Sequence, residues 1–209
     1  MLYLAESKKV VIVGIPGAGK TTLVSKIVEI LRNKNKSVSV HSFGTVMFEE
    51  AKKLGIENRD ELRKIAVDEQ KQLQALAAKK IAGFSDELVI IDTHAFISTK
   101  EGFYPGLPYP VLELLKPANF IAVSARPEEI YNRRMKDSTR SRDIISIDKI
   151  KKELAVQDAM LSSCVVLTGS PMKSVLNTEG KVEEAALEVI RSEEHTSELQ
   201  SLRHLVCRL

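Results

Sequence analysis

The stretch that decides the fold spans residues 9–22 and reads KVVIVGIPGAGKTT. Its opening part is mostly apolar and ends in glycine, which is typical of a buried strand in a parallel sheet. The remainder fits the pattern G-x-x-x-x-G-K-[ST], in which glycines allow the backbone to close around a phosphate. This phosphate loop consists of Gly14, Ile15, Pro16, Gly17, Ala18, Gly19, Lys20, Thr21 and Thr22.

The phosphate loop opens a helix that we expect over residues 19–31, because apolar residues recur there on one helical face. The dipole and free N–H groups of a helix N-terminus favour an anion. We therefore expect the loop to bind ATP, with Lys20 reaching the β- and γ-phosphates and the Thr21 hydroxyl binding Mg²⁺. Thr22 either touches the α-phosphate or solvates the start of the helix.

Strands and helices alternate along the rest of the chain. We expect further strands at 37–43, 87–92, 119–124 and 173–177, and helices at 45–54, 59–82, 111–115, 127–136, 147–167 and 182–190. Residues 93–110 are rich in glycine and proline and are expected to form a loop. This order predicts an α/β fold of the P-loop NTPase type: a doubly wound, parallel, five-stranded sheet with helices on both faces and a short lid. Ligands bind such sheets at the carboxyl ends of the strands.

One carboxylate stands at such a strand end. Residues 89–92 read VIID, and Asp92 beside a phosphate loop is expected to hold Mg²⁺, directly or through water; the plainer alternative is a helix cap. His94 follows two residues later. It either orients a substrate phosphate or satisfies the loop backbone, and the sequence does not separate these roles.

A basic segment follows the fourth expected strand and its helix. Residues 133–143 read RRMKDSTRSRD, with four arginines and one lysine. A run of charges is usually a solvated face. Phosphoryl transfer, however, needs positive charge around the phosphate oxygens, and arginine supplies planar paired donors. We expect a short lid to bring the arginines of this segment to the phosphates and to exclude water.

The acceptor side is expected after the second strand. Thr45 lies near a predicted helix N-terminus that favours an anion. Arg59 and Arg63 are four residues apart, hence on one helix face, where they either clamp a monophosphate or form ordinary surface charge. Residues 104–108, YPGLP, either wall a base pocket or form a surface loop, and we favour the pocket.

Composition excludes several classes of protein. Of the 209 residues, 44% are hydrophobic and 28% charged, which favours one packed domain over disorder. No apolar run approaches a membrane span, and the N-terminus does not resemble a signal peptide. Two cysteines cannot build a disulfide scaffold, which fits a cytoplasmic protein. A net charge of +3, no tryptophan and 5% aromatic residues do not favour a nucleic-acid partner.

The end of the chain differs from the rest. Residues 191–209 read RSEEHTSELQSLRHLVCRL, and no turn introduces this change in composition. Its first part resembles a translated sequencing-library adapter, so we expect a non-native tail without functional residues. The alternative is a genuine C-terminal helix, because a helical period passes through Leu199, Leu202 and Val206.

Several stretches together resemble the archaeal-type adenylate kinases, over roughly residues 8–190. They are GIPGAGKTT, FGTVMFEEA, NRDELRK, IIDTH followed by GFYPGLP, and RRMKDSTRSRD. The resemblance implies reversible, Mg²⁺-dependent conversion of ATP and AMP into two ADP, in the cytoplasm and often by a homotrimer. It implies an adenylate kinase domain at 1–190, with an AMP-binding part at about 43–84 and a short lid at about 134–147.

The resemblance also implies roles for single residues. The phosphate loop would bind ATP, Asp92 would support the metal, and Arg134, Arg140 and Arg142 would surround the transferred phosphate. AMP would be held by Thr45, Arg59 and Arg63. The chain departs from bacterial-type enzymes, because residues 93–95 read THA where those enzymes carry an arginine after a D-G-F-P turn. It also lacks their long or cysteine-bearing lid, so no zinc is expected.

The expected chemistry has no covalent enzyme intermediate. The phosphate of AMP is already anionic, so catalysis requires positioning and charge neutralisation rather than a general base. Two other functions stay open at this point. One is a kinase for another small acceptor, such as UMP, CMP or shikimate, and the other is a non-catalytic nucleotide-dependent switch.

Overall fold

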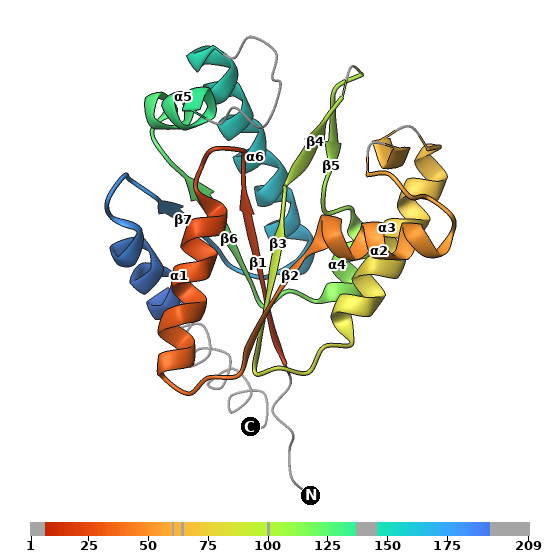
Figure 1. Ribbon diagram of the computed structural model, residues 1–209, viewed down its shortest axis with the longest axis horizontal. Helices are drawn as coiled ribbons and strands as arrows, with labels where there is room; N and C mark the ends of the chain where they lie inside the picture. Colours follow the sequence, from red (N-terminus) through yellow and green to blue (C-terminus); the bar gives the residue numbers. More distant parts are fainter. Residues whose placement is uncertain (1–6, 60, 64, 100, 137–145, 193–209) are drawn as a thin grey trace, which may run out of the picture.

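The computed structural model describes residues 7–59, 61–63, 65–99, 101–136 and 146–192. Its centre is a five-stranded, entirely parallel sheet in the order β2-β3-β1-β6-β7. The strands are β1 (Lys8–Gly14), β2 (Val38–Ser42), β3 (Leu88–Thr93), β6 (Asn119–Ser124) and β7 (Met172–Leu176). β1, which leads into the phosphate loop, therefore lies between β3 and β6 (Figure 1).

Helices cover both faces of the sheet (Figure 1). They are α1 (Lys20–Asn33), α2 (Phe43–Lys53), α3 (Val67–Ala82), α4 (Tyr109–Leu115), α5 (Pro127–Lys136), α6 (Ile147–Thr168) and a last helix at 182–192. The predicted doubly wound α/β fold is thus confirmed. Among the described residues, no helix combines the length and the apolar character that a membrane crossing requires.

The core consists of two layers, because successive side chains of a strand point to opposite faces. Val10 and Ile12 of β1 face α1 and the last helix, in a cluster that also includes Val175 of β7. Val11 and Val13 face the other layer, to which α3, α4 and α6 contribute. Residues 10–14 of the central strand are thus buried on both sides, which explains why this part of its sequence is apolar.

Two expectations about local structure were wrong. Residues 93–110 are not simply a loop, because β4 (Phe96–Ser98) and β5 (Phe103–Pro105) form an antiparallel hairpin. The rings of Phe96 and Phe103 stabilise it by edge-to-face contact, with centroids 5.0 Å apart. The helix expected at 59–82 begins only at Val67, after a short 3-10 turn, η1 (Glu61–Arg63).

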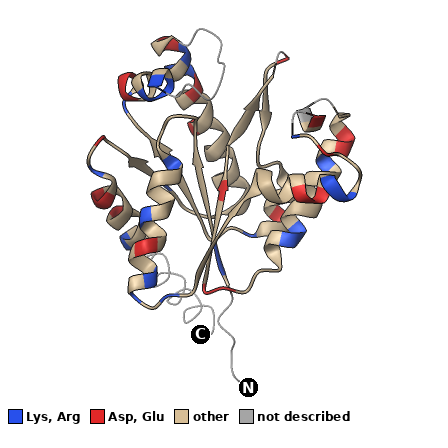
Figure 2. Cartoon of the chain, viewed as in Figure 1, with Lys and Arg blue, Asp and Glu red and all other residues tan. Residues whose placement is uncertain are grey.

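Charge follows the layering. Figure 2 shows basic and acidic residues on the outer helices and turns, whereas the strands at the centre carry very few. A charged group at the carboxyl end of a central strand is therefore an exception.

Candidate active site

The phosphate loop joins β1 to α1 at the carboxyl end of the sheet. The N–H of Ala18 donates to the carbonyl of Ile15 at 3.1 Å and closes a turn with Pro16 and Gly17 at its centre. Gly17 and Gly19 have φ angles of 87° and 82°, a left-handed conformation that side chains disfavour. A Cβ on Gly17 would also lie 3.0 Å from Arg134, so both glycines are required by conformation and by space.

Lys20 and Asp92 meet at the mouth of this loop. Asp92 lies on β3, the neighbour of β1, and the Lys20 Nζ is 2.5 Å from its Oδ1. Lys20 also donates to the carbonyl of Thr93. Burial lowers the pKa of Lys20, and the carboxylate of Asp92 opposes that shift. The ammonium is therefore held in place by β3.

Asp92 has one feature that fits a metal site. Its Oδ1 atom is buried at the carboxyl end of β3, beside the phosphate loop, and its partner there is the ammonium of Lys20. Thr21, one residue beyond Lys20, is exposed in the first turn of α1. Carboxylate and hydroxyl oxygens are ligands that Mg²⁺ accepts, with water and phosphate completing its shell. The described residues contain no cluster of three His, Cys, Asp or Glu that would suit another metal.

His94 contacts the backbone of the phosphate loop, as one of its two predicted roles requires, and a role toward a substrate phosphate stays a prediction. Its Nδ1 lies 2.9 Å from the carbonyl oxygen of Gly14. Because a carbonyl can only accept, Nδ1 carries the hydrogen in this contact. The ring therefore connects the residue after β3 to the start of the phosphate loop.

Of the predicted catalytic arginines in the basic segment, the structure describes only Arg134. Arg134 is buried, donates from Nε to the carbonyl of Pro16 at 2.7 Å, and pairs through Nη2 with Glu153 at 2.7 Å. Its guanidinium thus contacts the phosphate loop through a backbone carbonyl, and its catalytic role stays a prediction. Arg140 and Arg142, and most of the expected lid at 134–147, lie outside the described residues.

On the acceptor side, two of the three predicted residues are in contact. The Arg59 Nη2 donates to the Thr45 hydroxyl at 2.8 Å, across the gap between α2 and the segment before η1. The guanidinium carbon also lies 5.9 Å from the centroid of the Phe48 ring. Arg63 ends η1. Tyr104, expected to wall a base pocket, is exposed on the β4-β5 hairpin.

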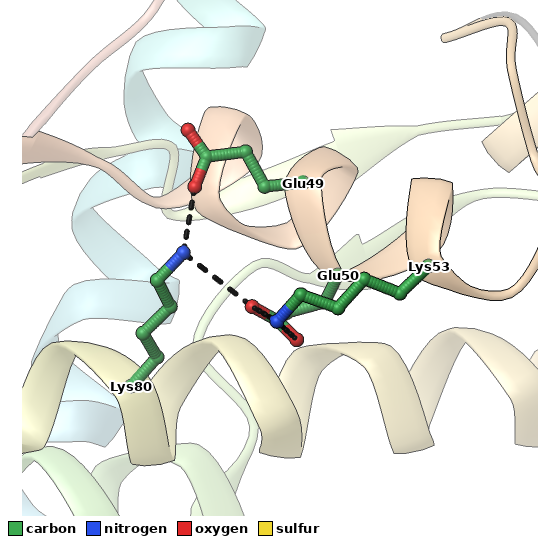
Figure 3. Close-up of polar contacts among 4 residues, drawn as sticks. All are labelled: Glu49, Glu50, Lys53 and Lys80. Atoms are coloured by element: carbon green, nitrogen blue, oxygen red, sulfur yellow. Dashed lines mark hydrogen bonds and ion pairs between the residues drawn. The ribbon is translucent and has the colours of Figure 1, made fainter.

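An ion-pair network joins α2 and α3, the two helices of the predicted AMP-binding part (Figure 3). Lys80 of α3 reaches both Glu49 and Glu50 of α2, at 2.7 and 3.4 Å. Lys53, one turn beyond Glu50, also pairs with it, at 2.7 Å. Lys80 lowers the pKa of Glu49, and Lys53 together with Lys80 lowers the pKa of Glu50. The network therefore fixes α2 against α3 while the carboxyl groups are ionised.

Three residues beside the phosphate loop were not predicted. Asn177 donates to the carbonyls of Ala18 and Gly19, Arg133 donates to the carbonyl of Gly17, and Glu153 pairs with Arg134. Only Asn177 could have been predicted from the sequence, because it directly follows an expected strand and residues at strand ends line such sites. The other two contacts join distant segments without any characteristic spacing.

Known proteins resemble this chain closely in sequence. Residues 13–151 match a family model described as an AAA domain. The chain is 42% identical to the adenylate kinase of Methanocaldococcus jannaschii, over 88% of this chain and 97% of that protein. It is 43% identical to the adenylate kinase of Sulfurisphaera tokodaii, over 87% of this chain and 97% of that protein.

Among solved structures, the shikimate kinase of Acinetobacter baumannii in complex with shikimate superposes with a TM-score of 0.60. The match covers 92% of this chain and 96% of that one at 15% sequence identity, so it supports the fold alone. The relatives of high identity decide the family. The chain belongs to the family of archaeal-type adenylate kinases.

Proposed function

We propose that this chain catalyses reversible phosphoryl transfer from ATP to AMP, giving two ADP, and so maintains the balance of adenine nucleotides. The observation that carries the proposal is the Lys20–Asp92 pair, 2.5 Å apart at the mouth of a glycine-lined loop. The curated relatives named adenylate kinase support the choice of reaction. The chain is a transferase that acts on a phosphate acceptor.

The donor side is the phosphate loop, Gly14, Ile15, Pro16, Gly17, Ala18, Gly19, Lys20, Thr21 and Thr22. Its N–H groups and the dipole of α1 would bind the phosphates of ATP. Lys20 would neutralise charge that develops on the transferred phosphate, and Asp92 and the Thr93 carbonyl hold its ammonium in position beforehand. No general base is needed, because the attacking oxygen of AMP is already ionised.

Mg²⁺ is the implied cofactor, and the residues fit it. Thr21 and Asp92 would hold the ion, Asp92 directly or through water. When bound, the ion neutralises negative charge on the β- and γ-phosphates of ATP. Because Lys20 also contacts Asp92, the carboxylate would serve both cations from one position.

The acceptor side would bind AMP within residues 43–84. Thr45 and Arg59 are already in contact, and Arg63 follows on the same short segment. Arg134, Arg140 and Arg142 would surround the transferred phosphate and close the site as part of a lid at about 134–147. Arg134 would have to exchange at least part of its contact with Pro16 or Glu153 to do so.

The test is a coupled assay of ADP formation from ATP and a panel of acceptors, on a chain that ends at Ile190. AMP is expected to be the preferred acceptor, with UMP, CMP and shikimate much poorer. Preference for one of those three would replace the proposal with a different small-acceptor kinase. Slow ATP hydrolysis without ADP formation from AMP would indicate a nucleotide-dependent switch.

The same proposal includes a cytoplasmic enzyme that assembles as a homotrimer and needs neither a nucleic acid nor a membrane as partner. Light scattering coupled to size exclusion would give the mass of the assembly, and a monomer at assay concentration would remove the trimer from the proposal. The mass is best measured without residues 191–209, which we propose to be a non-native tail.

A further inference from the structure

Asn177 lies at the carboxyl end of β7 and is anchored on both sides. Its backbone N–H donates to the carbonyl of Ser124 at 2.8 Å, and its own carbonyl accepts a hydrogen bond from Arg133 Nη2 at 3.1 Å. The residue is 4% exposed. Its side chain is thus held by the sheet rather than by the loop that it contacts.

The side-chain amide of Asn177 uses both of its hydrogens on the phosphate loop. Its Nδ2 lies 3.1 Å from the carbonyl oxygen of Ala18 and 3.1 Å from that of Gly19. A Cβ on Gly19 would lie 2.3 Å from this nitrogen, so the contact exists only because residue 19 has no side chain. The pattern G-K-T therefore requires this glycine for its φ angle and also for access by Asn177.

The direction of these two carbonyls fixes the direction of two N–H groups. In a trans peptide, the C=O of one residue and the N–H of the next point to opposite sides, and the described chain has no cis peptide bond. When Asn177 holds the carbonyls of Ala18 and Gly19, the N–H groups of Gly19 and Lys20 point away from β7. These are donors at the N-terminus of α1, where helical N–H groups have no partner within the helix and favour an anion.

We infer that Asn177 is a positioning residue for the triphosphate of ATP. It acts through the backbone of Ala18 and Gly19 and holds the N–H groups of Gly19 and Lys20 in the orientation that a phosphate requires, before the nucleotide arrives. The inference rests on the proposed function, because it assumes that the donor nucleotide binds at this loop. It implies that Asn177 affects ATP and leaves AMP largely unaffected.

The experiment compares Asn177→Asp and Asn177→Ala with the unmodified full chain. Calorimetry would measure the dissociation constants of the non-hydrolysable analogue adenylyl imidodiphosphate with Mg²⁺ and, separately, of AMP. The aspartate has the same shape but cannot donate when ionised, and it repels both carbonyls. We expect it to weaken binding of the analogue about tenfold or more and to leave AMP binding within about twofold.

Steady-state kinetics supply a second readout. The KM for ATP should rise in both variants while the KM for AMP stays near its original value, a split that general loosening of the fold would not produce. Asn119→Ala is the matched control, because Asn119 is a buried asparagine at the opposite end of β6. It is expected to lower the melting temperature without selectively weakening the analogue.

Two results would overturn the inference. One is a folded Asn177 variant that binds the analogue as tightly as the unmodified chain, and the other is an equal loss of affinity for the analogue and for AMP. If Asn177→Ala does not fold, the isosteric Asn177→Asp still decides. Failure of the proposed function is separate, because it would appear as no ADP formation by the unmodified chain even though the analogue binds.

Discussion

Lys20 is the residue on which the proposed chemistry depends most directly. Lys20→Ala is expected to lower kcat for ADP formation about a hundredfold or more, because a preorganised cation at the transferred phosphate is lost. Removing the cation also leaves Asp92 without its ion-pair partner. The coupled assay measures the effect, with melting temperature as the check on folding. Near-normal turnover would remove Lys20 from the mechanism.

Lys26→Ala provides the comparison for that variant. Lys26 lies on the same helix, α1, but pairs with Glu29 at 2.9 Å away from the loop. Its loss should leave kcat within about twofold, since surface ion pairs contribute little. A comparable fall in both variants would point to damage to α1 rather than to the phosphate site.

Asp92 gives a prediction about the metal. Asp92→Asn keeps the shape of the side chain but removes its charge, so it should raise the Mg²⁺ concentration needed for half-maximal activity about tenfold or more. Asp86→Asn is the matched control, because Asp86 precedes β3 and accepts a hydrogen bond from the Ser37 hydroxyl at the opposite end of the sheet. Titration of Mg²⁺ at saturating nucleotide measures both, and an unchanged requirement in Asp92→Asn would contradict the assignment.

A buried amide gives the fourth prediction, about stability. Gln157 of α6 is 1% exposed, and neither its Oε1 nor its Nε2 has a hydrogen-bond partner among the described residues. Gln157→Leu is expected to raise the free energy of unfolding by about 1–3 kcal/mol, because it removes a desolvated polar group that is not compensated. Denaturant unfolding measures the change.

The comparison for this variant is Gln74→Leu on α3. Gln74 keeps 8% exposure and so part of its contact with water, and its replacement should bring little gain. A Gln157→Leu chain with a lower free energy of unfolding than the unmodified chain would contradict this prediction.

The sequence could predict the phosphate loop, Lys20 and Asp92 because each follows from a rule of local pattern. A glycine-rich turn after an apolar strand and a carboxylate at the end of another strand point to one edge of one sheet. Arg133 and Glu153 could not be predicted in the same way. Their partners, Gly17 and Arg134, depend on how α5 and α6 pack over the loop, which leaves no spacing in the sequence.

At the scale of elements, α2 and α3 are joined by charges that respond to pH. Lys80 lowers the pKa of Glu49, and Lys53 with Lys80 lowers that of Glu50, so their stabilisation is present above pH 4.5 and is lost as the pH falls through the lowered values. Contact with Glu49 raises the pKa of Lys80 above 10.5. The stabilisation that Lys80 contributes is therefore present at neutral pH and is lost only as the pH rises through that raised pKa. The two helices, α2 and α3, should therefore be held together most firmly near neutral pH.

Lys80→Met tests this coupling. At neutral pH it should melt at a slightly lower temperature than the unmodified chain. The difference should shrink as the pH falls below 4.5 through the lowered pKa values of Glu49 and Glu50, and vanish once both carboxyl groups bind protons. Lys79→Met, a change at the neighbouring exposed residue, should show no such pH dependence. A difference that persists undiminished at acidic pH would show that Lys80 stabilises α3 without its carboxylate partners.

Elements with a strong period were predictable, and those set by tertiary contact were not. The strands of the sheet and α5 follow from apolar runs and from proline in the first turn. The β4-β5 hairpin was predicted as a loop because residues 93–110 are rich in glycine and proline, with Gly102 just before β5 and Pro105 at its end. Its pairing depends on contact between Phe96 and Phe103, which alternation over three residues is too short to reveal.

At the scale of the whole molecule, the alternation of elements was enough to predict a parallel, doubly wound sheet, because parallel strands need crossover connections. The order of the strands in the sheet cannot be predicted from the alternation alone. It places β1 between β3 and β6, so that the loop after β1 lies beside Asp92. Only this arrangement in space turns separate motifs into one site.

The sheet order also has a consequence for synthesis of the chain. β1 leaves the ribosome first, but its neighbours β3 and β6 follow only about 80 and 110 residues later. This central strand must therefore wait unpaired for several seconds at typical rates of translation, exposed to aggregation or to a chaperone. Pairing of β1 with β3 and β6, rather than formation of any helix, is expected to limit how fast a newly synthesised chain reaches its native fold.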